Sequence, residues 1–328
     1  MSKPVVYVGV DVGKDEVWAA MAGQKLRSFP QTATGAQALV AWATQVADVR
    51  CVHVCMESTS VYSRSLAVRL VSVENLVVSM VNPAQVKAFS RAQLRRTKTD
   101  RVDARVILAF AQSQHPAPWR PEPEAVRKLC ALVTLADTLR EDQQRWKNRR
   151  HALDHPPDAL PEVRPAQQAV QAVVQDELVK VERAIRKLVA EEPSLREAIQ
   201  ALRSITGIGP ISSARLVAYG NVRLTERTPR QATAHAGPAP SQHQSGSSVH
   251  GKSHLAKQGD KRLRTALYMP ILSAIQHNPV IKASYERLRE RGKPNKVAMV
   301  ACMRKPLLLA RAIMISRKPF DPCFQQLT

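Results

Sequence analysis

Hydrophobic residues in the first third of the chain alternate between strand-like and helix-like spacing. Short apolar runs predict strands at 5–11, 15–23, 25–29, 52–57 and 75–81. Apolar positions that recur every three or four residues predict helices at 34–47, 61–71, 84–92 and 100–114, and Pro83 suits the start of the third helix. The order of three strands, helix, strand, helix, strand, helix, helix favours an α/β layer fold.

The middle of the chain has the spacing of long amphipathic helices. Apolar residues repeat at heptad positions between 129 and 146 and again between 174 and 188, and the proline-rich segment 154–165 separates the two runs. Two such helices form either an antiparallel hairpin or a coiled coil that joins subunits. An ordinary helical spacer within one subunit is the simplest alternative.

The last part of the chain is predicted to be mainly helical. Apolar residues flank a tight turn at Gly207 and Gly209, as in a helix-hairpin-helix, whose second helix can hold a phosphate on its first N–H groups. A plain helix-turn-helix connection gives the same pattern. A polar loop follows at 236–254, and helical spacing resumes at 261–276 and 295–315. We therefore expect domains at 1–118, 119–199 and 200–328.

Composition narrows the class of protein. The hydrophobic content of 44% excludes wholesale disorder. No apolar run approaches the roughly 18 residues needed to span a membrane, and the N-terminus lacks the layout of a signal peptide. The five cysteines are scattered without a CxxC pair, which argues against a disulfide framework or a zinc site. We expect a cytoplasmic protein.

Charge indicates the partner. The chain has 49 Lys and Arg against 27 Asp and Glu, a net charge of +22. Folding does not require such an excess of positive charge, but binding to a polyanion such as nucleic acid does. Aromatic residues make up only 4% of the chain, so we expect phosphate contacts to dominate over base stacking.

Four acidic residues stand where an α/β sheet would collect them. Asp11 closes the first predicted strand, Glu57 closes the fourth, and Asp100 and Asp103 share one face of a later helix. At that spacing the last two carboxylates are about 5–6 Å apart at Cβ. The edge where strands end carries the functional site in open α/β sheets. Either neighbouring Arg and Lys side chains neutralise these acids, or the acids bind one or two Mg²⁺ ions, as in phosphoryl-transfer enzymes.

Seven motifs then appear in a familiar order over nearly the whole chain: "GVDVGKDE", "CMEST", "VNPAQVKAF", "KTDRVDAR", "ITGIGPISSARLVAY", "AGPAPSQHQSGSSVHG" and "ALYMP". In this order they resemble the DEDD-type transposases of bacterial insertion sequences, the IS one-ten family, which includes the pilin-gene invertases. The resemblance implies a RuvC-like, ribonuclease-H-like first domain whose catalytic, metal-binding acids are Asp11, Glu57, Asp100 and Asp103. It also implies that Ser245, in "SGSS", is a nucleophile.

The resemblance further implies partners. Members of the family bind a structured non-coding guide RNA that pairs with donor and target double-stranded DNA, and we expect a dimer or tetramer on nucleic acid. Candidate nucleic-acid contacts flank the acids, the glycine turn and the serine loop: Arg95, Arg96, Lys98, Arg101, Gly207, Gly209, Lys252, Lys257, Lys261, Arg262 and Arg264. The sequence departs from the family at Ser60, His235, Pro238 and Pro306, and Pro306 should start or kink a helix.

Three functions remain open. The first is an RNA-guided recombinase that cuts, exchanges and rejoins DNA strands. The second is a Mg²⁺-dependent, junction-resolvase-like endonuclease that uses water as its nucleophile. The third, a non-catalytic binding protein, is opposed by the four acids and the serine loop.

Overall fold

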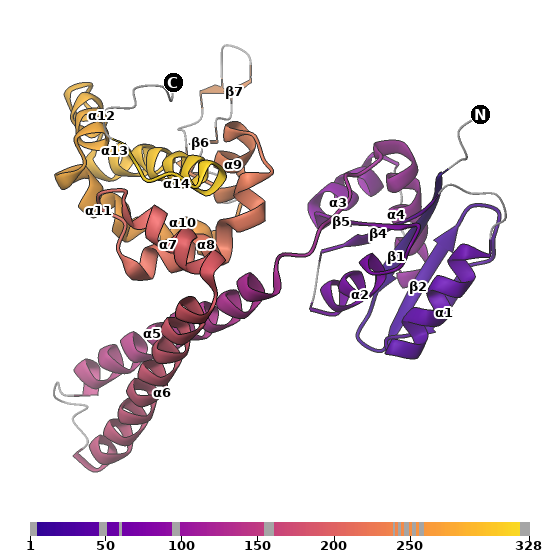
Figure 1. The fold of residues 1–328 in the computed structure, drawn as a ribbon, viewed down its shortest axis with the longest axis horizontal. Coiled ribbons are helices and arrows are strands. Elements are labelled where there is room, and N and C mark those ends of the chain that lie inside the picture. Colours follow the sequence, from indigo (N-terminus) through magenta and orange to yellow (C-terminus); the bar gives the residue numbers. More distant parts are fainter. Residues whose placement is uncertain are drawn as a thin grey trace. The chain divides into compact units, whose positions relative to one another are not determined.

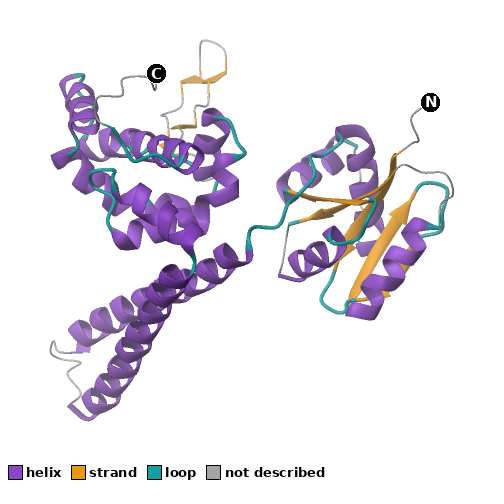
Figure 2. Cartoon of the chain, viewed as in Figure 1, coloured by secondary structure: helices purple, strands orange, loops and turns teal. Residues whose placement is uncertain are grey.

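The structure is a computed structural model that describes residues 5–45, 51–58, 61–93, 99–153, 161–238, 240–241, 244–245, 249–250, 254–255 and 259–321. The chain divides into two compact units, Met1–Pro121 and Glu122–Thr328. The first unit is mixed α/β, and the second consists mostly of helices (Figures 1 and 2). A mixed sheet domain followed by a mainly helical region is what the sequence predicted.

The first unit has its elements in the predicted order. They are β1 (Val5–Val12), β2 (Glu16–Met21), β3 (Arg27–Pro30), α1 (Ala33–Thr44), β4 (Cys51–Glu57), α2 (Val61–Val71), β5 (Leu76–Val81), α3 (Pro83–Ala92) and α4 (Asp100–Gln114). The strands form one sheet in the order β3-β2-β1-β4-β5, in which β1, β4 and β5 run parallel. Gly23, with φ 74°, permits the tight turn between the antiparallel strands β2 and β3.

Helices cover both faces of this sheet. On one face, α1 and α2 bury apolar side chains against even-numbered residues of β1 and β4, such as Val8, Val10 and Val54. On the other face, α3 and α4 pack against odd-numbered residues, among them Cys55. The alternation follows from the two-residue period of a strand. It also decides which residues at the strand ends share a face.

The second unit is described by a longer set of elements. They are α5 (Glu124–Leu153), the 3₁₀ turn η1 (Pro161–Val163), α6 (Arg164–Glu191), α7 (Pro193–Arg203), α8 (Pro210–Thr225), α9 (Pro229–Ala236), β6 (Pro240–Ser241), β7 (Gln244–Ser245), β8 (Val249–His250), β9 (His254–Leu255), α10 (Lys261–Ala266), α11 (Tyr268–His277), α12 (Pro279–Glu290), α13 (Asn295–Cys302) and α14 (Arg304–Ser316). Within the described residues of this unit, none of the helices is long and apolar enough to cross a membrane.

Helices α5 and α6 form an antiparallel hairpin within the chain, the first of the two arrangements considered for the heptad runs (Figure 1). Ala136, Leu178 and Val181 are buried in the seam between the helices, and Leu132, Leu139 and Ile185 pack against them. Farther from the rest of the unit the contact becomes polar, with Gln143 donating a hydrogen bond to Gln175. The base of the hairpin enters the main core of the unit, which also buries residues of α7, α8, α10 and α14.

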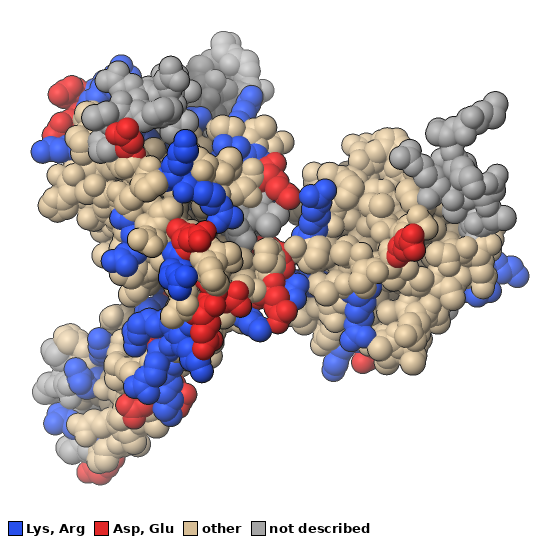
Figure 3. Space-filling view, in the orientation of Figure 1, with Lys and Arg blue, Asp and Glu red and all other residues tan. Residues whose placement is uncertain are grey.

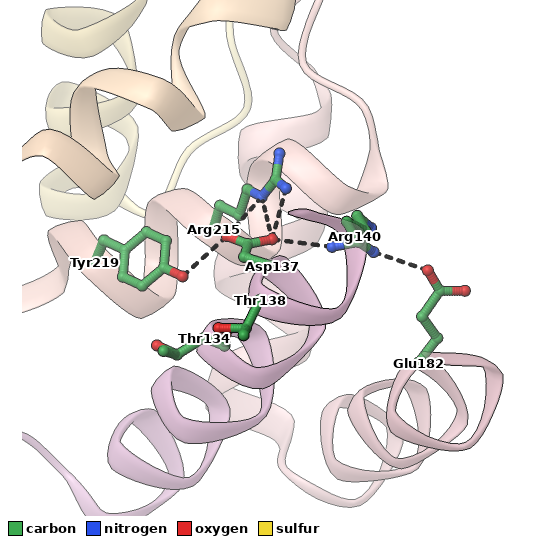
Figure 4. Close-up of polar contacts among 7 residues, drawn as sticks. All are labelled: Thr134, Asp137, Thr138, Arg140, Glu182, Arg215 and Tyr219. Carbon is green, nitrogen blue, oxygen red and sulfur yellow. Dashed lines mark hydrogen bonds and ion pairs between the residues drawn. The ribbon is translucent and has the colours of Figure 1, made fainter. Parts of the chain in front are cut away.

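An ionic network fastens the hairpin to α8 (Figure 4). The carboxylate of Asp137 accepts hydrogen bonds from Arg215 Nε at 2.9 and 3.1 Å, from Tyr219 Oη at 3.0 Å and from Arg140 Nη1 at 3.0 Å. Arg140 in turn pairs with Glu182 of α6 at 2.8 Å. Burial raises the pKa of Tyr219 to about 12, and the charge of Asp137 contributes to the rise. The Asp137 carboxylate therefore joins α5 to α8, and Arg140 extends the network to Glu182 of α6.

Two prolines divide the predicted C-terminal helices. The segment 261–276 breaks into α10 and α11, and the segment 295–315 breaks into α13 and α14. Pro270 and Pro306 are each the third residue of the second helix, and the first helix ends four residues earlier, at Ala266 and Cys302. Proline has no N–H for the carbonyl four residues before it, and its ring clashes with that carbonyl. The expectation that Pro306 starts or kinks a helix is confirmed.

Candidate active site

The direction of α4 brings its first turn to the edge where β1 ends. Tyr7 Oη lies 2.8 Å from His115 Nδ1, at the C-terminal cap of α4. Two residues further along β1, a Cβ at Gly9 would overlap backbone atoms of Ala104 and Leu108, so helix and strand are in direct backbone contact there. Because the helix runs opposite to the strand, the next residue on this face, Asp11, lies toward the start of α4.

Glu57 comes to the same edge on the neighbouring strand. β1 and β4 are parallel with Val10 opposite Met56, which places Asp11 and Glu57 one step beyond that pair. Cys55, two residues before Glu57, is buried in the core under α4, so Glu57 shares this face. Burial raises the pKa of the Cys55 thiol to about 12, and the negative charge of Glu57 contributes to the rise. The two strand-end carboxylates are therefore neighbours on one face.

Asp100 and Asp103 occupy the first turn of α4, where Thr99 caps the helix by accepting a hydrogen bond from Val102 N at 3.3 Å. Asp100 is exposed and Asp103 is half-buried. The partial positive charge of a helix N-terminus stabilises nearby carboxylates. The first turn thus places two further carboxylates toward the edge of the sheet where Asp11 and Glu57 lie.

The four acids share an edge but do not form a finished metal site. Among the described residues, no three His, Cys, Asp or Glu side chains are grouped so that they could hold a metal ion. The donor set nevertheless fits Mg²⁺, which prefers carboxylate oxygens, and none of the four acids is fully buried. The sequence predicted the backbone placement, while a converged arrangement of four carboxylates is not observed.

The serine loop contains paired backbone. Pro240 and Ser241 pair with Leu255 and His254, and Gln244 and Ser245 pair with His250 and Val249. The ends of the loop are joined because Asp260 N donates to His235 O at 2.6 Å. Ser245 therefore lies in a short strand of a closed loop, in a segment for which the sequence predicted only a polar loop. Its side chain lies outside the described part of the structure.

The predicted nucleic-acid contacts fall into two groups. Arg95, Arg96, Lys98, Lys252, Lys257 and the side chain of Arg101 lie outside the described residues. The others are in the second unit: Gly207 and Gly209 between α7 and α8, and Lys261, Arg262 and Arg264 on α10. The guanidinium of Arg262 lies 6.0 Å from the centre of the Tyr219 ring.

Gly207 has φ 103°, and a Cβ there would meet Ala274 at 2.9 Å, so this turn requires glycine. A Cβ at Gly209 would meet no atom within 4 Å. The turn therefore leaves Gly209 and the start of α8 open on one side. On the face drawn in Figure 3, Lys and Arg side chains lie over the hairpin helices together with Asp and Glu side chains, a mixed charged surface that the sequence analysis did not single out.

Two family models match the chain. A transposase model matches residues 8–154, which include all four acids, and a model described as the transposase IS116/IS110/IS902 family matches residues 199–286, which include Ser245. The chain is therefore an enzyme of the DNA transposase and recombinase class. It belongs to the IS110 family of insertion-sequence transposases, the family whose motifs it resembles.

Similar proteins agree with this assignment. The chain is 28% identical to the pilin gene-inverting protein of Moraxella bovis and 27% identical to that of Moraxella lacunata, each over 98% of both chains. It is also 27% identical to an IS110 insertion-element protein of Streptomyces coelicolor, over 42% of this chain and 34% of that protein.

Proposed function

We propose that this protein is an RNA-guided DNA recombinase that moves an insertion sequence, with a RuvC-like acidic site and a serine nucleophile. The observation that carries the proposal is the shared edge of the first unit. There, the register of β1 and β4 and the direction of α4 bring Asp11, Glu57 and the first turn of α4 to one face. This edge lies within the matched transposase region.

Asp11, Glu57, Asp100 and Asp103 are the residues that would hold divalent metal. Bound there, Mg²⁺ would supply electrostatic stabilisation of charge developing on a scissile phosphate. Lys and Arg around the site would position the DNA backbone.

The serine accounts for the rejoining of strands. In this proposal Ser245 Oγ loses its proton and bonds to phosphorus, while the bond from phosphorus to one sugar oxygen breaks and that oxygen gains a proton. A sugar hydroxyl of another strand then displaces the serine in the reverse exchange. The phosphodiester is conserved throughout, which hydrolysis by water would not achieve.

A guide RNA and several subunits complete the proposal. The net charge of +22 with 4% aromatic residues suits RNA held by its backbone and shape, while base pairing reads the DNA. Exchange of two duplexes requires more than one active site, so we propose a dimer or tetramer on nucleic acid. RNA that copurifies with the full chain should map to one end of the element, whereas random cellular RNA would contradict guidance.

The alternative function is a Mg²⁺-dependent, structure-specific endonuclease without a covalent intermediate. The acidic edge of the first unit supports it equally well, since that edge does not depend on Ser245. A covalent link between protein and DNA separates the two functions.

Replacement of single acids tests the acidic site. Asp11→Asn or Asp103→Asn should abolish cleavage of labelled donor DNA in Mg²⁺ and leave RNA binding unchanged, because each removes one carboxylate from a shared site. Glu74→Gln is the control, since Glu74 is exposed and lies just before β5, at the opposite edge of the sheet. Cleavage at the wild-type rate by both Asp variants would refute the acidic site.

A further inference from the structure

A cavity of about 500 Å³ lies between α5, α6, α7 and α8 in the second unit. Its floor is aliphatic, formed by Val133, Ile185, Val189, Ile199, Ile211 and Ala214. Its volume falls in the range of about 300–1,000 Å³ that is typical of ligand sites, which are mostly apolar with a few placed polar groups. All of its described lining residues belong to these four helices.

Arginines form the polar part of the wall: Arg140, Arg186, Arg196, Arg203 and Arg215. Three of them already have partners. Arg140 and Arg215 bind Asp137, and Arg196 Nη1 donates to the carbonyl of Ala190 at 3.1 Å. The acidic residue of the wall, Glu182, is paired with Arg140. These contacts hold part of the wall in place and leave the positive charges of the other wall arginines available.

Arg186 and Arg203 are the arginines whose donors remain available. Both are exposed, and among the described residues neither forms a hydrogen bond or an ion pair. They reach the same cavity from α6 and α7. A guanidinium group binds phosphate through two parallel hydrogen bonds and stacks on flat rings. An aliphatic floor with free guanidinium groups at its rim fits a ligand that is anionic at one end and flat and apolar at the other.

We propose that this cavity binds one unstacked nucleotide of a single-stranded nucleic acid. The base lies against the aliphatic floor, and its phosphate binds Arg186 and Arg203. Inorganic phosphate would bind the arginines but would not fill the aliphatic floor. An aliphatic side chain from a second copy would fill the floor but would not bind the arginines. The inference deepens the proposed function, because it rests on nucleic-acid binding by this chain.

A second cavity favours a strand over a free mononucleotide. It is about 640 Å³ in volume and shares Arg203 with the first. Its wall includes Ser204, Arg317, Pro319 and the carboxylate of Glu197. A strand with one nucleotide in the first cavity can continue past Arg203 with its next phosphate near Arg317. A polymer ligand accounts for both cavities.

The test blocks the first cavity in the full chain. Ala190 lines the cavity and is exposed, so Ala190→Trp should fold and occupy its mouth. Ala172→Trp is the matched control, because Ala172 is exposed on the same helix and does not line the cavity. The probes are oligothymidylate and oligouridylate of about 16 nucleotides, together with the same backbones lacking bases.

Ala190→Trp should weaken binding of a base-bearing strand by roughly 5- to 150-fold, the range for loss of one bound base, and leave binding of the base-free strand unchanged. Loss with the DNA probe, the RNA probe or both identifies which strand the cavity takes. Arg186→Ala should weaken binding of both base-bearing and base-free strands, while its control Arg183→Ala, at an exposed arginine outside the cavity, should weaken binding less.

Unchanged binding by both Ala190→Trp and Arg186→Ala would overturn the inference. So would equal loss with base-bearing and base-free strands for Ala190→Trp, since that would mean that no base enters. The cavity residues belong to α5, α6, α7 and α8, and the four acids belong to β1, β4 and α4, so probe binding and cleavage of donor DNA test them separately. If the cavity variants bind the probes like the wild type, the proposed acidic site is not refuted. If Asp103→Asn still cleaves DNA, the proposed nucleotide cavity is not refuted.

Discussion

Replacing Asp137 with asparagine should loosen the junction between the hairpin and α8. The substitution keeps the shape of the side chain and removes the negative charge that holds Arg215, Arg140 and Tyr219. It also turns one acceptor into an NH₂ group that faces arginine donors. The guanidinium group of Arg215 would then lie in a partly buried position without its counter-charge, while Arg140 would keep Glu182.

The structure sets the size of this effect. Hydrogen bonds to charged groups contribute about 1.5–3 kcal/mol each, and breaking a buried ion pair costs about 3–5 kcal/mol. The side chains of Arg215 and Asp137 are 18% and 24% exposed, so solvent screens part of the interaction. We expect the free energy of opening at this junction to fall by about 2–3 kcal/mol, which corresponds to roughly 30- to 150-fold faster amide exchange.

Hydrogen exchange measured by mass spectrometry reports on the junction directly. Peptides from α8 and the adjoining turns of α5 should exchange faster in Asp137→Asn, while peptides from β1 and β4 should not change. Asp142→Asn is the matched control, because Asp142 pairs with Arg145 on the exposed side of the same helix and should change stability by less than about 0.5 kcal/mol. Equal effects of the two variants would refute the structural role of the Asp137 network.

Two further predictions concern the first unit. Gly9→Ala should destabilise this unit by about 1–3 kcal/mol and reduce DNA cleavage, because the new methyl group forces α4 and its two aspartates away from the sheet. The control, Gly23→Asn, lies at a turn that asparagine tolerates and should change neither stability nor cleavage. A stable and active Gly9→Ala variant would contradict the packing of α4 against β1. Burial, assisted by the charge of His115, lowers the pKa of His53 from 6.5, so the unfolded chain takes up a proton at a pH where the folded one does not. The contribution of His53 to stability should therefore be fully present above about pH 6.5 and should fall as the pH decreases below that value. His53→Gln can still donate a hydrogen bond to Ser79 and should flatten this pH dependence of the melting temperature. An unchanged slope would exclude His53 as the source of the pH dependence.

The sequence predicted the elements of the first unit well because their signals are local. The two-residue and 3.6-residue periods, Pro83 at the start of α3 and the tight turn at Gly23 are each readable within a few positions. Pro270 carried the same local signal as Pro306, and the break that it makes between α10 and α11 was predictable but was missed.

Contacts between residues far apart in the sequence could not be predicted from local patterns. Asp137 and Arg215 are 78 residues apart, and no pattern near either residue identifies the other as its partner. The short strands around Ser245 were missed because two-residue pairs in a polar segment have no hydrophobic alternation. The positions of Asp11 and Glu57 at strand ends predicted that both acids lie at the same edge of the sheet. The sequence could not determine how closely the four carboxylates approach one another.

The most direct test of the central claim is to map the protein–DNA adduct. The full chain with its copurifying RNA, Mg²⁺ and donor and target DNA should yield a covalent species that survives denaturation and is joined to DNA through Ser245. Mass spectrometry should locate the link at this residue, and Ser245→Ala should lose both the adduct and all recombination. Recombination by Ser245→Ala, or an adduct that maps to Ser247 or Ser248, would contradict the account.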